Sequence, residues 1–462
     1  MTEITKSIFR EYDIRGIYPI EINEEVIIQI AKAISIKCIS ENVSEICLGR
    51  DGRNSSKSLS YSLEKSLSNF GVDVENIGLV TTPLLYFASK KCKSKSGVMI
   101  TGSHNPKNYN GLKIVIDKKS MTSQKIEEIK NMISNDNYFN GSGEMSKLEI
   151  KKDYLKELQE KIRLDSKLKV CLDCGNGVGG LVAPDAFKIL GINLIEMFSN
   201  VDGEFPNHHP DPSNLENLKD LQSKVLETNS DLGIALDGDG DRVGLVDNKG
   251  EVIFPDIYMM LLAEDILERH RSGNIVYDIK CSNNLKNVIL NSNGTPIISR
   301  TGHSYIKSKI IEENALLGGE MSGHIFFNDD WYGFDDGIYS ALRLIEILSK
   351  RKSSPHQIFA NYPKNYSTPE INIPISDKRK FEIIEVLKPI VNKNEYKLVD
   401  IDGIRLEKEN CWGLIRASNT SPNLVLRFEG KSEQDLNEIK NYFKEILSKI
   451  DIQKKIFFDE YF

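Results

Sequence analysis

Short apolar runs alternate with helix-like stretches along most of this sequence, and this alternation restricts the possible folds more than any other feature. The stretch 58–70, for example, places Leu59, Leu63 and Leu67 on one face of a helix. The predicted strands cover residues 46–49, 98–100, 168–173, 192–197, 233–236 and 275–279. Alternating strands and helices pack as layers, so the sequence predicts an α/β fold.

Three of the apolar runs end in a polar loop that contains glycine. The runs at 98–100, 234–236 and 316–317 lead into the loops 101–106, 237–242 and 318–324. In open α/β sheets, ligands bind at the carboxyl ends of strands. We therefore expect three domains that each offer one loop to a shared cleft.

The length of the chain predicts more than one domain. Its 462 residues exceed the roughly 250–300 residues at which a single hydrophobic core stops growing. The pattern breaks at an Asn-, Gly- and Ser-rich stretch (135–146), a turn (247–250) and a stretch with three prolines (362–374). After the last break, strands at 398–401, 414–417 and 424–428 precede a helix that Ser432 and Asp435 open with a capping pattern. We predict four domains, spanning 1–148, 149–251, 252–364 and 365–462.

The composition excludes several classes of protein. A formal net charge of −7 disfavours nucleic-acid binding through a basic surface, so an anionic ligand would need a local basic site. No apolar run approaches the roughly 20 residues that span a bilayer, and residues 1–13 lack the apolar core of a signal peptide. Seven scattered cysteines fit reduced thiols better than a disulfide framework, and Cys171 and Cys174 would point to opposite faces of a strand. We therefore expect a cytoplasmic protein.

The segment 101–106 (TGSHNP) places Ser103 at the end of a predicted strand, between a glycine and a histidine. Gly102 lets the backbone approach a ligand. His104 or the nearby Lys113 offers the base or cation that a serine hydroxyl needs to act as a nucleophile. The same residue types also form ordinary hydrogen-bonded turns, which remain an alternative. Ser103 is the candidate nucleophile.

Three aspartates alternate with glycines in the segment 237–242 (DGDGDR). The carboxylates of Asp237, Asp239 and Asp241 can converge on one hard cation, and Mg²⁺ prefers such oxygen ligands. An EF-hand would need glycine at its sixth position and glutamate at its twelfth, where this chain has Arg242 and Asn248. A solvated acidic turn is disfavoured because three close like charges repel one another without a counter-ion. The sequence predicts a magnesium site.

Two further segments carry groups suited to a polyhydroxylated ligand and to phosphate. In 319–324, Glu320 and Ser322 can hydrogen-bond to hydroxyls, and His324 can transfer protons near neutral pH. In 416–421, Arg416 precedes a run of hydroxyl and amide side chains, as in a phosphate cradle. Further arginines near the N-terminus stand in turn-like segments, and these are Arg10, Arg15, Arg50 and Arg53.

A glycine pattern in the second predicted domain supports a different function. Gly175, Gly177 and Gly180 follow a strand as G-x-G-x-x-G, and Glu196 ends the next strand, as in a dinucleotide site. An NAD-linked dehydrogenase is therefore an alternative, although it explains neither the aspartates nor the Ser103 loop. The sequence contains no G-x-x-x-x-G-K-[ST] loop, which disfavours a kinase or ATPase of that type.

Taken together, the four segments resemble the α-D-phosphohexomutase family, and most closely its bacterial bifunctional phosphomannomutase/phosphoglucomutase branch. The matching motifs follow one another in order from residue 9 to about residue 430. The resemblance explains the glycine pattern as a turn of the second domain. Beyond the four segments, the motifs are 9–16 (FREYDIRG), 49–56 (GRDGRNSS), 202–215 (DGEFPNHHPDPSNL), 277–282 (YDIKCS), 301–307 (TGHSYIK), 331–337 (WYGFDDG) and 412–428.

The resemblance implies three related α/β domains and a smaller C-terminal α+β domain around a central cleft. Phosphorylated Ser103 would transfer its phosphoryl group to a hexose phosphate, and the resulting hexose 1,6-bisphosphate would turn round and return its other phosphate. Mg²⁺ would be held by the three aspartates and a phosphoserine oxygen. The resemblance assigns proton transfer and charge neutralisation to Lys113, Arg15, Arg242 and His324. It assigns substrate binding to Tyr12, Lys280, His303, Glu320, Ser322, Arg416, Ser418, Asn419 and Thr420.

The resemblance also bears on the substrate and on the alternatives. Met321 departs from the glutamine of the phosphoglucosamine branch, which makes mannose or glucose phosphates the expected substrates. A catalytically inactive sugar-phosphate sensor would lose Ser103 or an aspartate, and this chain keeps them all. We expect a monomer that binds a small phosphosugar and neither nucleic acid nor membrane.

Overall fold

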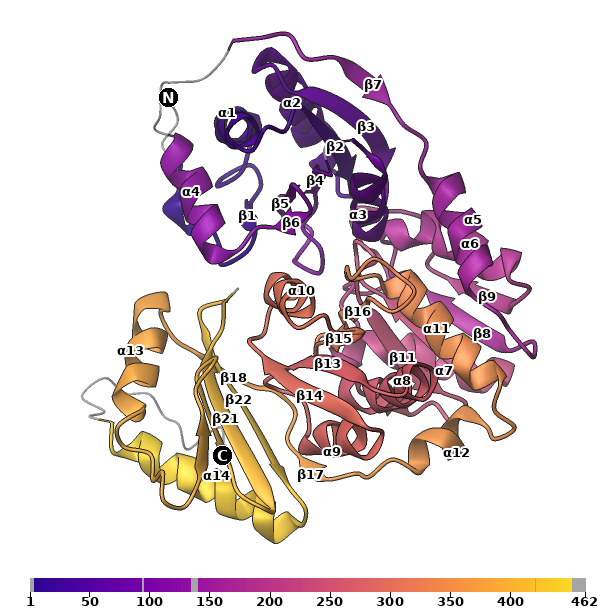
Figure 1. Cartoon of the computed structure of the whole chain (residues 1–462), viewed down its shortest axis with the longest axis vertical. Helices are drawn as coiled ribbons and strands as arrows, with labels where there is room; N and C mark the ends of the chain where they lie inside the picture. Colours follow the sequence, from indigo (N-terminus) through magenta and orange to yellow (C-terminus); the bar gives the residue numbers. More distant parts are fainter. Residues whose placement is uncertain (1–3, 94, 134–139, 420, 451–462) are drawn as a thin grey trace.

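The computed structural model describes residues 4–93, 95–133, 140–419 and 421–450, which form four successive sheets (Figure 1). In Figure 1 the chain passes from the first sheet at the top through the second at the right and the third in the centre to the fourth at the lower left. None of the helices in this part of the chain is long and apolar enough to cross a membrane. Thr420 and the tail 451–462 lie outside the described residues.

The first sheet has the strand order β1-β5-β4-β2-β3-β7, with β6 paired to β5. β2 runs parallel to β3 and β4, whereas β5 runs antiparallel to β4 and β1. Helices α1, α2 and α4 pack on one face of this sheet, and α3 packs on the other. The elements are η1 (Lys6–Ile8), β1 (Ile14–Ile17), α1 (Glu24–Ser40), β2 (Glu45–Arg50), α2 (Ser56–Asn69), β3 (Asp73–Leu79), α3 (Thr82–Lys91), β4 (Gly97–Ile100), β5 (Tyr109–Ile116), β6 (Lys119–Ser120), α4 (Ser123–Ile133) and β7 (Met145–Lys147).

The second sheet has the order β12-β11-β10-β8-β9, in which β10, β8 and β9 are parallel and β11 and β12 form antiparallel pairs. Its central strands β8, β10 and β11 are almost completely buried because both faces are covered, whereas the edge strand β9 is partly exposed. The elements are α5 (Lys151–Lys161), β8 (Lys169–Asp173), η2 (Val178–Leu181), α6 (Ala183–Ile189), β9 (Asn193–Met197), η3 (Leu215–Leu218), α7 (Lys219–Thr228), β10 (Leu232–Leu236), β11 (Val243–Asp247) and β12 (Val252–Ile253).

The third sheet has the order β14-β13-β15-β16, in which β13 is parallel to β14 and β15, and β16 is antiparallel to β15. The elements are α8 (Pro255–His270), β13 (Gly273–Asp278), α9 (Asn283–Asn291), β14 (Gly294–Ser299), α10 (His303–Glu312), β15 (Leu317–Gly319), β16 (Ile325–Phe327), α11 (Gly337–Ser349) and α12 (Pro355–Ala360).

The fourth sheet is antiparallel throughout, with the order β17-β22-β21-β20-β19 and with β18 also paired to β22. Helix α14 packs on it and begins with the predicted capping box, in which Ser432 and Asp435 bond to each other's backbone. The elements are β17 (Tyr366–Ser367), β18 (Ile371–Pro374), α13 (Asp377–Leu387), β19 (Lys397–Val399), β20 (Ile404–Glu407), β21 (Cys411–Ala417), β22 (Asn423–Gly430) and α14 (Glu433–Ser448).

The first three sheets share one local arrangement. In each, a strand that lies parallel to its neighbour ends in a polar loop, and the chain returns as an antiparallel strand. The three pairs are β4 and β5, β10 and β11, and β15 and β16, so the loops are 101–108, 237–242 and 320–324. These are the three glycine-bearing loops of the sequence, and the predicted internal similarity is confirmed.

One apolar core runs through the first three domains. It joins side chains of α3, the strands of the second sheet and the helices α8 and α11. Helix α11 is buried on nearly every side, and its apolar faces pack against α8, β11 and α6. The fourth domain has a core of its own, and a small apolar cluster of Ile279, Trp412 and Leu414 joins it to the third.

The predicted fold class is confirmed, with element boundaries that differ from the predictions by one to three residues. All seven cysteines are free and buried, as the sequence predicts. The four sheets span 14–147, 169–253, 273–327 and 366–430. The domain boundaries after residues 148 and 364 fall between these sheets, whereas the boundary after residue 251 separates β12 from the rest of the second sheet, and we retain all three as a proposal.

Candidate active site

The loop that carries Ser103 is held by two buried residues of the segment 50–55. The backbone N–H of Gly102 donates to Asp51 Oδ2 at 3.0 Å. A Cβ at Gly102 would lie 2.5 Å from the Arg53 guanidinium, so only glycine fits at this position. Arg53, which is 2% exposed, donates to carbonyl oxygens around the loop. Their distances are 2.7 Å for Ser103, 2.6 Å for Asn105, 2.6 Å for Pro106 and 3.1 Å for Tyr109.

Ser103 is 1% exposed, and its φ of +48° lies in the left-handed region. The Oγ atom donates to Asp237 Oδ2 at 3.1 Å and lies 3.2 Å from His104 Nδ1. Burial and then the charge of Arg242 hold the pKa of His104 well below its usual value. The imidazole beside the candidate nucleophile is therefore neutral, and its Nε2 faces the guanidinium of Arg242.

The aspartate loop closes around the carboxylate of Asp237. Its Oδ1 accepts the backbone N–H groups of Gly240, Asp241 and Arg242 at 3.0, 3.0 and 3.1 Å. A Cβ at Gly238 would lie 2.6 Å from the carbonyl oxygen of Ser103, so the absence of a side chain at Gly238 allows the aspartate loop and the Ser103 loop to touch. Burial and the two neighbouring aspartates raise the pKa of Asp237 well above its usual value, which indicates a shortage of positive charge.

The other two aspartates face Lys113 with one oxygen each. Lys113 Nζ lies 2.7 Å from Asp239 Oδ2 and also binds Asp241 Oδ2, while Thr82 Oγ1 donates to Asp239 Oδ2 at 2.5 Å. Asp239 Oδ1 is buried and has no hydrogen-bond partner among the described residues, and the buried Asp241 Oδ1 faces His324. Ligand oxygens of all three aspartates lie within 4.8 Å of one another. These donors fit a hard divalent cation.

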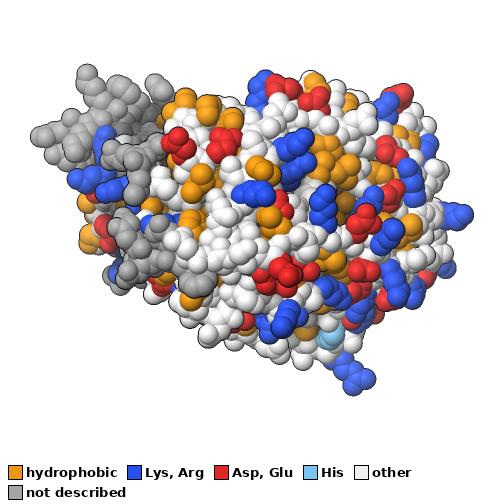
Figure 2. Space-filling view, turned by 90° about the horizontal axis from the view of Figure 1, so that it is seen from above, with side chains coloured by type: hydrophobic (Ala, Val, Ile, Leu, Met, Phe, Trp, Pro, Cys, Tyr) orange, Lys and Arg blue, Asp and Glu red, His pale blue; other side chains and the backbone are white. Residues whose placement is uncertain are grey.

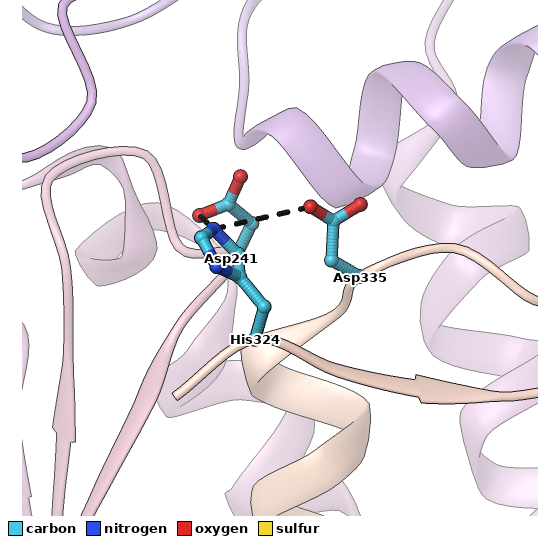
Figure 3. Close-up of side chains that lie close together, drawn as sticks. All are labelled: Asp241, His324 and Asp335. Atoms are coloured by element: carbon cyan, nitrogen blue, oxygen red, sulfur yellow. Dashed lines mark ion pairs between the residues drawn. The ribbon is translucent and has the colours of Figure 1, made fainter. Parts of the chain in front are cut away.

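His324 connects the aspartate loop to the loop of the third domain. Its Nε2 lies 3.3 Å from Asp241 Oδ1, and its Nδ1 lies 3.0 Å from Glu320 Oε2 and 2.8 Å from Ser322 Oγ. Burial alone would lower the pKa of His324, but the charge of Asp241 and hydrogen bonds to both carboxylates raise it to about 9. Figure 3 shows the ring between Asp241 on one side and Asp335 on the other.

Two residues of the N-terminal motif FREYDIRG also reach this centre. Arg15 lies on β1, where its Nε contacts Asp13 Oδ2 at 2.6 Å and its Nη1 donates to Asn105 Oδ1 at 3.0 Å. Tyr12 packs edge-on against His303 with ring centroids 4.8 Å apart. Arg242 also reaches the Ser103 loop, because its Nη2 lies 3.3 Å from His104 Nε2.

A second group of polar residues lies between the third and fourth domains. Lys280 Nζ lies 2.6 Å from Glu370 Oε1, and Arg416 Nε lies 2.9 Å from Asp402 Oδ2. The buried Arg416 Nη2 has no hydrogen-bond partner among the described residues, so one edge of its guanidinium is free for an anion. Asn419 Nδ2 donates to Thr301 O at 3.3 Å.

Hydrogen bonds join the two groups. The Gly302 N–H donates to Glu320 Oε1 at 2.5 Å, and the neighbouring Thr301 N–H donates to Asp402 Oδ2 at 3.0 Å. Glu320 contacts His324, and Asp402 contacts Arg416, so the turn before α10 lies between the Ser103 centre and the Arg416 cradle. Ser418 is buried in that cradle and accepts from the Ser421 N–H at 3.2 Å.

The structure thus brings the sequence-predicted residues into two connected groups, with Thr420 outside the part it describes. Sequence reasoning did not assign site roles to several residues that contact the predicted ones. For Arg53, Lys307 and Asp335 the signal was available, because each lies inside a quoted motif. Thr82, Glu370 and Asp402 had no such signal. The residues that it missed are Arg53, Thr82, Lys307, Asp335, Glu370 and Asp402.

The positive charges at this site are buried despite the net negative charge of the chain. Arg15, Lys113 and Arg242 are 7%, 3% and 8% exposed. On the outer face seen in Figure 2, basic and acidic side chains are interspersed without a large field of one sign. The expected local basic site is therefore internal and is built from single residues of several domains.

Four family profiles match the chain in order. They are described as phosphoglucomutase/phosphomannomutase alpha/beta/alpha domains I, II and III, at residues 6–139, 152–250 and 254–366, and its C-terminal domain, at residues 370–446. Together they match most of the sequence.

Full-length relatives agree with these matches. A phosphomannomutase/phosphoglucomutase of Pseudomonas syringae pv. tomato is 46% identical over 444 residues, which cover 96% of each chain. A crystal structure of a phosphoglucomutase/phosphomannomutase family protein from Burkholderia thailandensis superposes with a TM-score of 0.92 at 38% identity, over 96% of this chain and 98% of that one. The Aspergillus fumigatus N-acetylphosphoglucosamine mutase, solved with GlcNAc-6P and magnesium, shares the fold at 13% identity, with a TM-score of 0.59 over 96% of each chain. The chain therefore belongs to the phosphoglucomutase/phosphomannomutase family.

Proposed function

We propose that this chain interconverts the 1-phosphate and the 6-phosphate of mannose and glucose through a phosphorylated Ser103 and a hexose 1,6-bisphosphate. The observation that carries the proposal is the position of Ser103 Oγ, which is buried and 3.1 Å from Asp237 among cations from several domains. Full-length relatives at 44–46% identity carry the name phosphomannomutase/phosphoglucomutase, which supports the same activity.

Phosphoryl transfer depends mainly on positioning and on neutralising the charge of the phosphoryl oxygens. Lys113, Arg15 and Arg242 reach the Ser103 loop or the aspartates beside it, and each keeps its charge at neutral pH because carboxylates raise its pKa against the effect of burial. His324 carries an N–H at each nitrogen at neutral pH, which suits it to donate a proton to a sugar or phosphate oxygen.

The aspartate loop is proposed to hold Mg²⁺. The partnerless Asp239 Oδ1, together with carboxylate oxygens of Asp237 and Asp241 and the oxygen on Ser103, offers the hard ligands that this ion prefers. The ion would add positive charge at the transferring oxygens. In the same proposal, an externally supplied hexose 1,6-bisphosphate phosphorylates Ser103 and so activates the enzyme.

The second group of residues is proposed to bind the phosphate that is not being transferred. Arg416 and the backbone and side chains of 418–420 would grip it, Lys280 and His303 would contact it or the sugar, and Glu320 and Ser322 would read sugar hydroxyls. The free edge of the Arg416 guanidinium supports this assignment. All these groups come from one chain, which supports a monomer, and the seven free thiols support a cytoplasmic location.

The structure offers little support for the dehydrogenase alternative. The space beside two glycines of the G-x-G-x-x-G pattern is occupied by neighbouring residues. A Cβ at Gly177 would lie 2.7 Å from Gly238 O, and one at Gly180 would lie 2.0 Å from Ser199 O. Gly177 packs against the aspartate loop and Gly180 against the segment after β9, so the space that a pyrophosphate would need is occupied.

The phosphoserine is tested directly by mass spectrometry. Purified protein incubated with glucose 1,6-bisphosphate should gain about 80 Da, the mass of one phosphoryl group, on the peptide that contains Ser103. A coupled assay offering mannose 1-phosphate and glucose 1-phosphate should show turnover of both, and Ser103→Ala should abolish it. A chain that stays fully active without Ser103 would contradict the proposal, and a phosphorylated chain without turnover would identify a sensor.

The metal site is tested by chelation and by one substitution. Asp239→Asn should lower turnover about 100-fold, because one hard ligand is lost beside the transferring oxygens, and its melting temperature should stay close to wild type. Asp220→Asn, on the exposed first turn of α7, is the matched control and should behave as wild type. Unchanged turnover of the wild-type chain in excess chelator would rule out the site.

A further inference from the structure

The motif 331–337 (WYGFDDG) contains two successive aspartates that the proposed function does not use. Asp336 is structural: its carboxylate caps α11 by accepting the Tyr339 N–H at 2.9 Å, and it also accepts from Tyr154 and Trp331. A Cβ at Gly337 would lie 2.6 Å from Arg242 O, so the motif presses against the aspartate loop. Asp335 therefore stands at the edge of the site, as Figure 3 shows.

The carboxylate of Asp335 is fully buried and is bound at one oxygen only. Oδ1 lies 3.0 Å from Lys307 Nζ. Oδ2 has no hydrogen-bond partner among the described residues, yet it lies 3.5 Å from His303 Nδ1 and 4.0 Å from His324 Nε2. Leaving a buried carboxylate oxygen without a hydrogen bond lowers the stability of the fold. This points to a hydrogen bond that Oδ2 accepts in the working enzyme.

Helix α10 presents both partners of Asp335 on one face. His303 is the first residue of this helix, and Lys307 follows one turn later, so the two side chains lie side by side. Asp335 lies against both of them. Lys307 also lies over the Tyr86 ring at 4.1 Å, which fixes the ammonium and, through it, the carboxylate.

The rings of His303 and His324 both lie near Asp335 Oδ2, and they differ in their other partners. His324 already has Asp241 and Glu320 at its two nitrogens. His303 has no hydrogen bond at either nitrogen within the described chain, and its ring is held only by Tyr12 at 4.8 Å and by the stacked His324 at 5.7 Å. Asp335 is also closer to His303. Burial and the charge of Lys307 keep the pKa of His303 well below its usual value, so the ring carries a single N–H.

We propose that Asp335 is a positioning residue for His303: it accepts the Nδ1–H, fixes that tautomer and turns Nε2 toward the bound phosphosugar. The separation of 3.5 Å is longer than a hydrogen bond, and such contacts often tighten only when substrate is bound. Carboxylates fix the tautomer of functional histidines in this way in metal sites and in hydrolases. The inference rests on the proposed function because it assigns His303 a contact with the substrate.

The first experiment needs no variant and no activity. Nitrogen NMR of the full chain labelled in its seven histidines distinguishes Nδ1–H from Nε2–H, and the His303 signals are assigned by their loss in His303→Gln. Wild type with glucose 1,6-bisphosphate should show the Nδ1–H tautomer, and Asp335→Asn should show a mixture or the other tautomer. A wild-type His303 in the Nε2–H form would overturn the inference.

The second experiment is kinetic. Asp335→Asn should lower kcat about 10- to 100-fold with a change in KM below about 3-fold, and the double variant with His303→Gln should lose little more than His303→Gln alone. Asp335→Glu should recover part of the loss because it keeps a carboxylate. Asp330→Asn, at an exposed position in the same loop that pairs with Arg269, is the matched control.

The outcomes separate the two proposals. If wild type shows no mutase activity, the proposed function fails, while the tautomer measurement still decides the role of Asp335. If wild type is active and Asp335→Asn matches it in kcat and in tautomer, only the inference fails. Additive losses in the double variant would likewise show that Asp335 does not act through His303.

Discussion

Ser103 adopts a backbone conformation that residues with a side chain disfavour. Its φ of +48° lies in the left-handed region, which is unfavourable for an L-residue by about 1–2 kcal/mol. The four hydrogen bonds from Arg53 to the surrounding carbonyls hold the loop in this form. The same turn directs the hydroxyl to Asp237, so placing the nucleophile lowers the stability of the fold.

A pair of substitutions separates this strain from the chemistry. Ser103→Ala and Ser103→Gly should both abolish phosphoryl transfer. The free energy of unfolding in urea should nevertheless be about 0.5–1 kcal/mol higher for Ser103→Gly than for Ser103→Ala. Glycine relieves the left-handed strain, and this gain exceeds the cost of the added entropy of the unfolded chain. The same pair at the exposed Ser58 of helix α2 is the control and should give the opposite order. A less stable Ser103→Gly would show that the position is unstrained.

Arg416 is the residue whose loss should chiefly weaken binding. Its Nε is engaged by Asp402, and its free edge offers charged hydrogen bonds worth about 1.5–3 kcal/mol to a phosphate. Arg416→Ala should therefore raise KM about 10- to 100-fold in both directions of the reaction, since the 1-phosphate and the 6-phosphate use the same cradle in turn. Steady-state kinetics in both directions, with a thermal melt as control, measure this effect.

Lysine at this position should restore only part of the affinity, because an ammonium is a point charge and lacks the two parallel N–H groups of a guanidinium. If Arg416→Ala keeps wild-type KM values, Arg416 serves only as the partner of Asp402 and the phosphate is bound elsewhere.

At the scale of elements, the segment 202–215 fastens the end of β8. His208 Nε2 lies 2.9 Å from Asp173 Oδ2 and its ring packs edge-on against Phe198. Asn207 Nδ2 donates to Asn176 Oδ1 at 2.8 Å. The motif DGEFPNHHPDPSNL therefore positions the turn after β8, which in turn packs on the aspartate loop.

This contact predicts a pH-dependent stability. Burial alone would lower the pKa of His208, but the hydrogen bond and charge of Asp173 raise it above the usual 6.5. Because the pKa of His208 is raised in the folded state, its contact with Asp173 stabilises the fold fully below pH 6.5, and this stabilisation is lost as the pH rises through the raised pKa. His208→Asn should thus be less stable than wild type by about 1 kcal/mol near pH 5.5, and the difference should shrink toward pH 9. Urea titrations at both pH values measure it, and a constant difference would exclude the charged contact.

The three strand-to-loop transitions could be predicted because their signal is local. An apolar run that ends in glycine and carboxylates or hydroxyls is visible within nine residues, as at 98–106 and 234–242. Thr82, Glu370 and Asp402 could not be predicted, because their partners lie 157, 90 and 14 or 101 residues away and nothing beside them in the sequence is distinctive. Asp335 lay inside a quoted motif, but only packing against α10 shows which of the two aspartates faces the site.

At the scale of the molecule, the fourth domain is attached through a few polar contacts. Arg405 is fully buried, donates to the carbonyl oxygens of Ile279 and Cys281 and to Asn283 Oδ1, and lies over the Trp412 ring at 3.8 Å. Arg427 donates to Lys280 O at 2.5 Å. These contacts hold the segment 279–283 of the third domain against the sheet that carries the Arg416 cradle.

Arg405→Met should therefore loosen the fourth domain without unfolding the first three. The buried carbonyls lose their donor, which we expect to raise KM about 10-fold or more by misplacing the cradle. Ser103 should still accept phosphate from glucose 1,6-bisphosphate at high concentration. Limited proteolysis near residues 361–370 should become faster, as followed by electrophoresis, whereas Lys397→Met, on the exposed edge of the sheet, should cleave as wild type. Equal cleavage rates would mean that other contacts suffice.

The unequal division of the cores has a consequence for recombination between relatives. Because one apolar core runs through the first three domains and α11 packs into two of them, exchanging the second or third domain alone would mismatch dozens of buried side chains. The fourth domain keeps its own core, so a graft from a relative needs to reproduce a limited set of interface contacts: those of Arg405, Trp412 and Arg427 with 279–283, and those of Glu370, Asp402 and Asn419 with Lys280 and Thr301. A junction near residue 365 is thus the natural crossover point, and chimeras made there would exchange the phosphate-gripping module as a unit while leaving the nucleophile and its cations untouched.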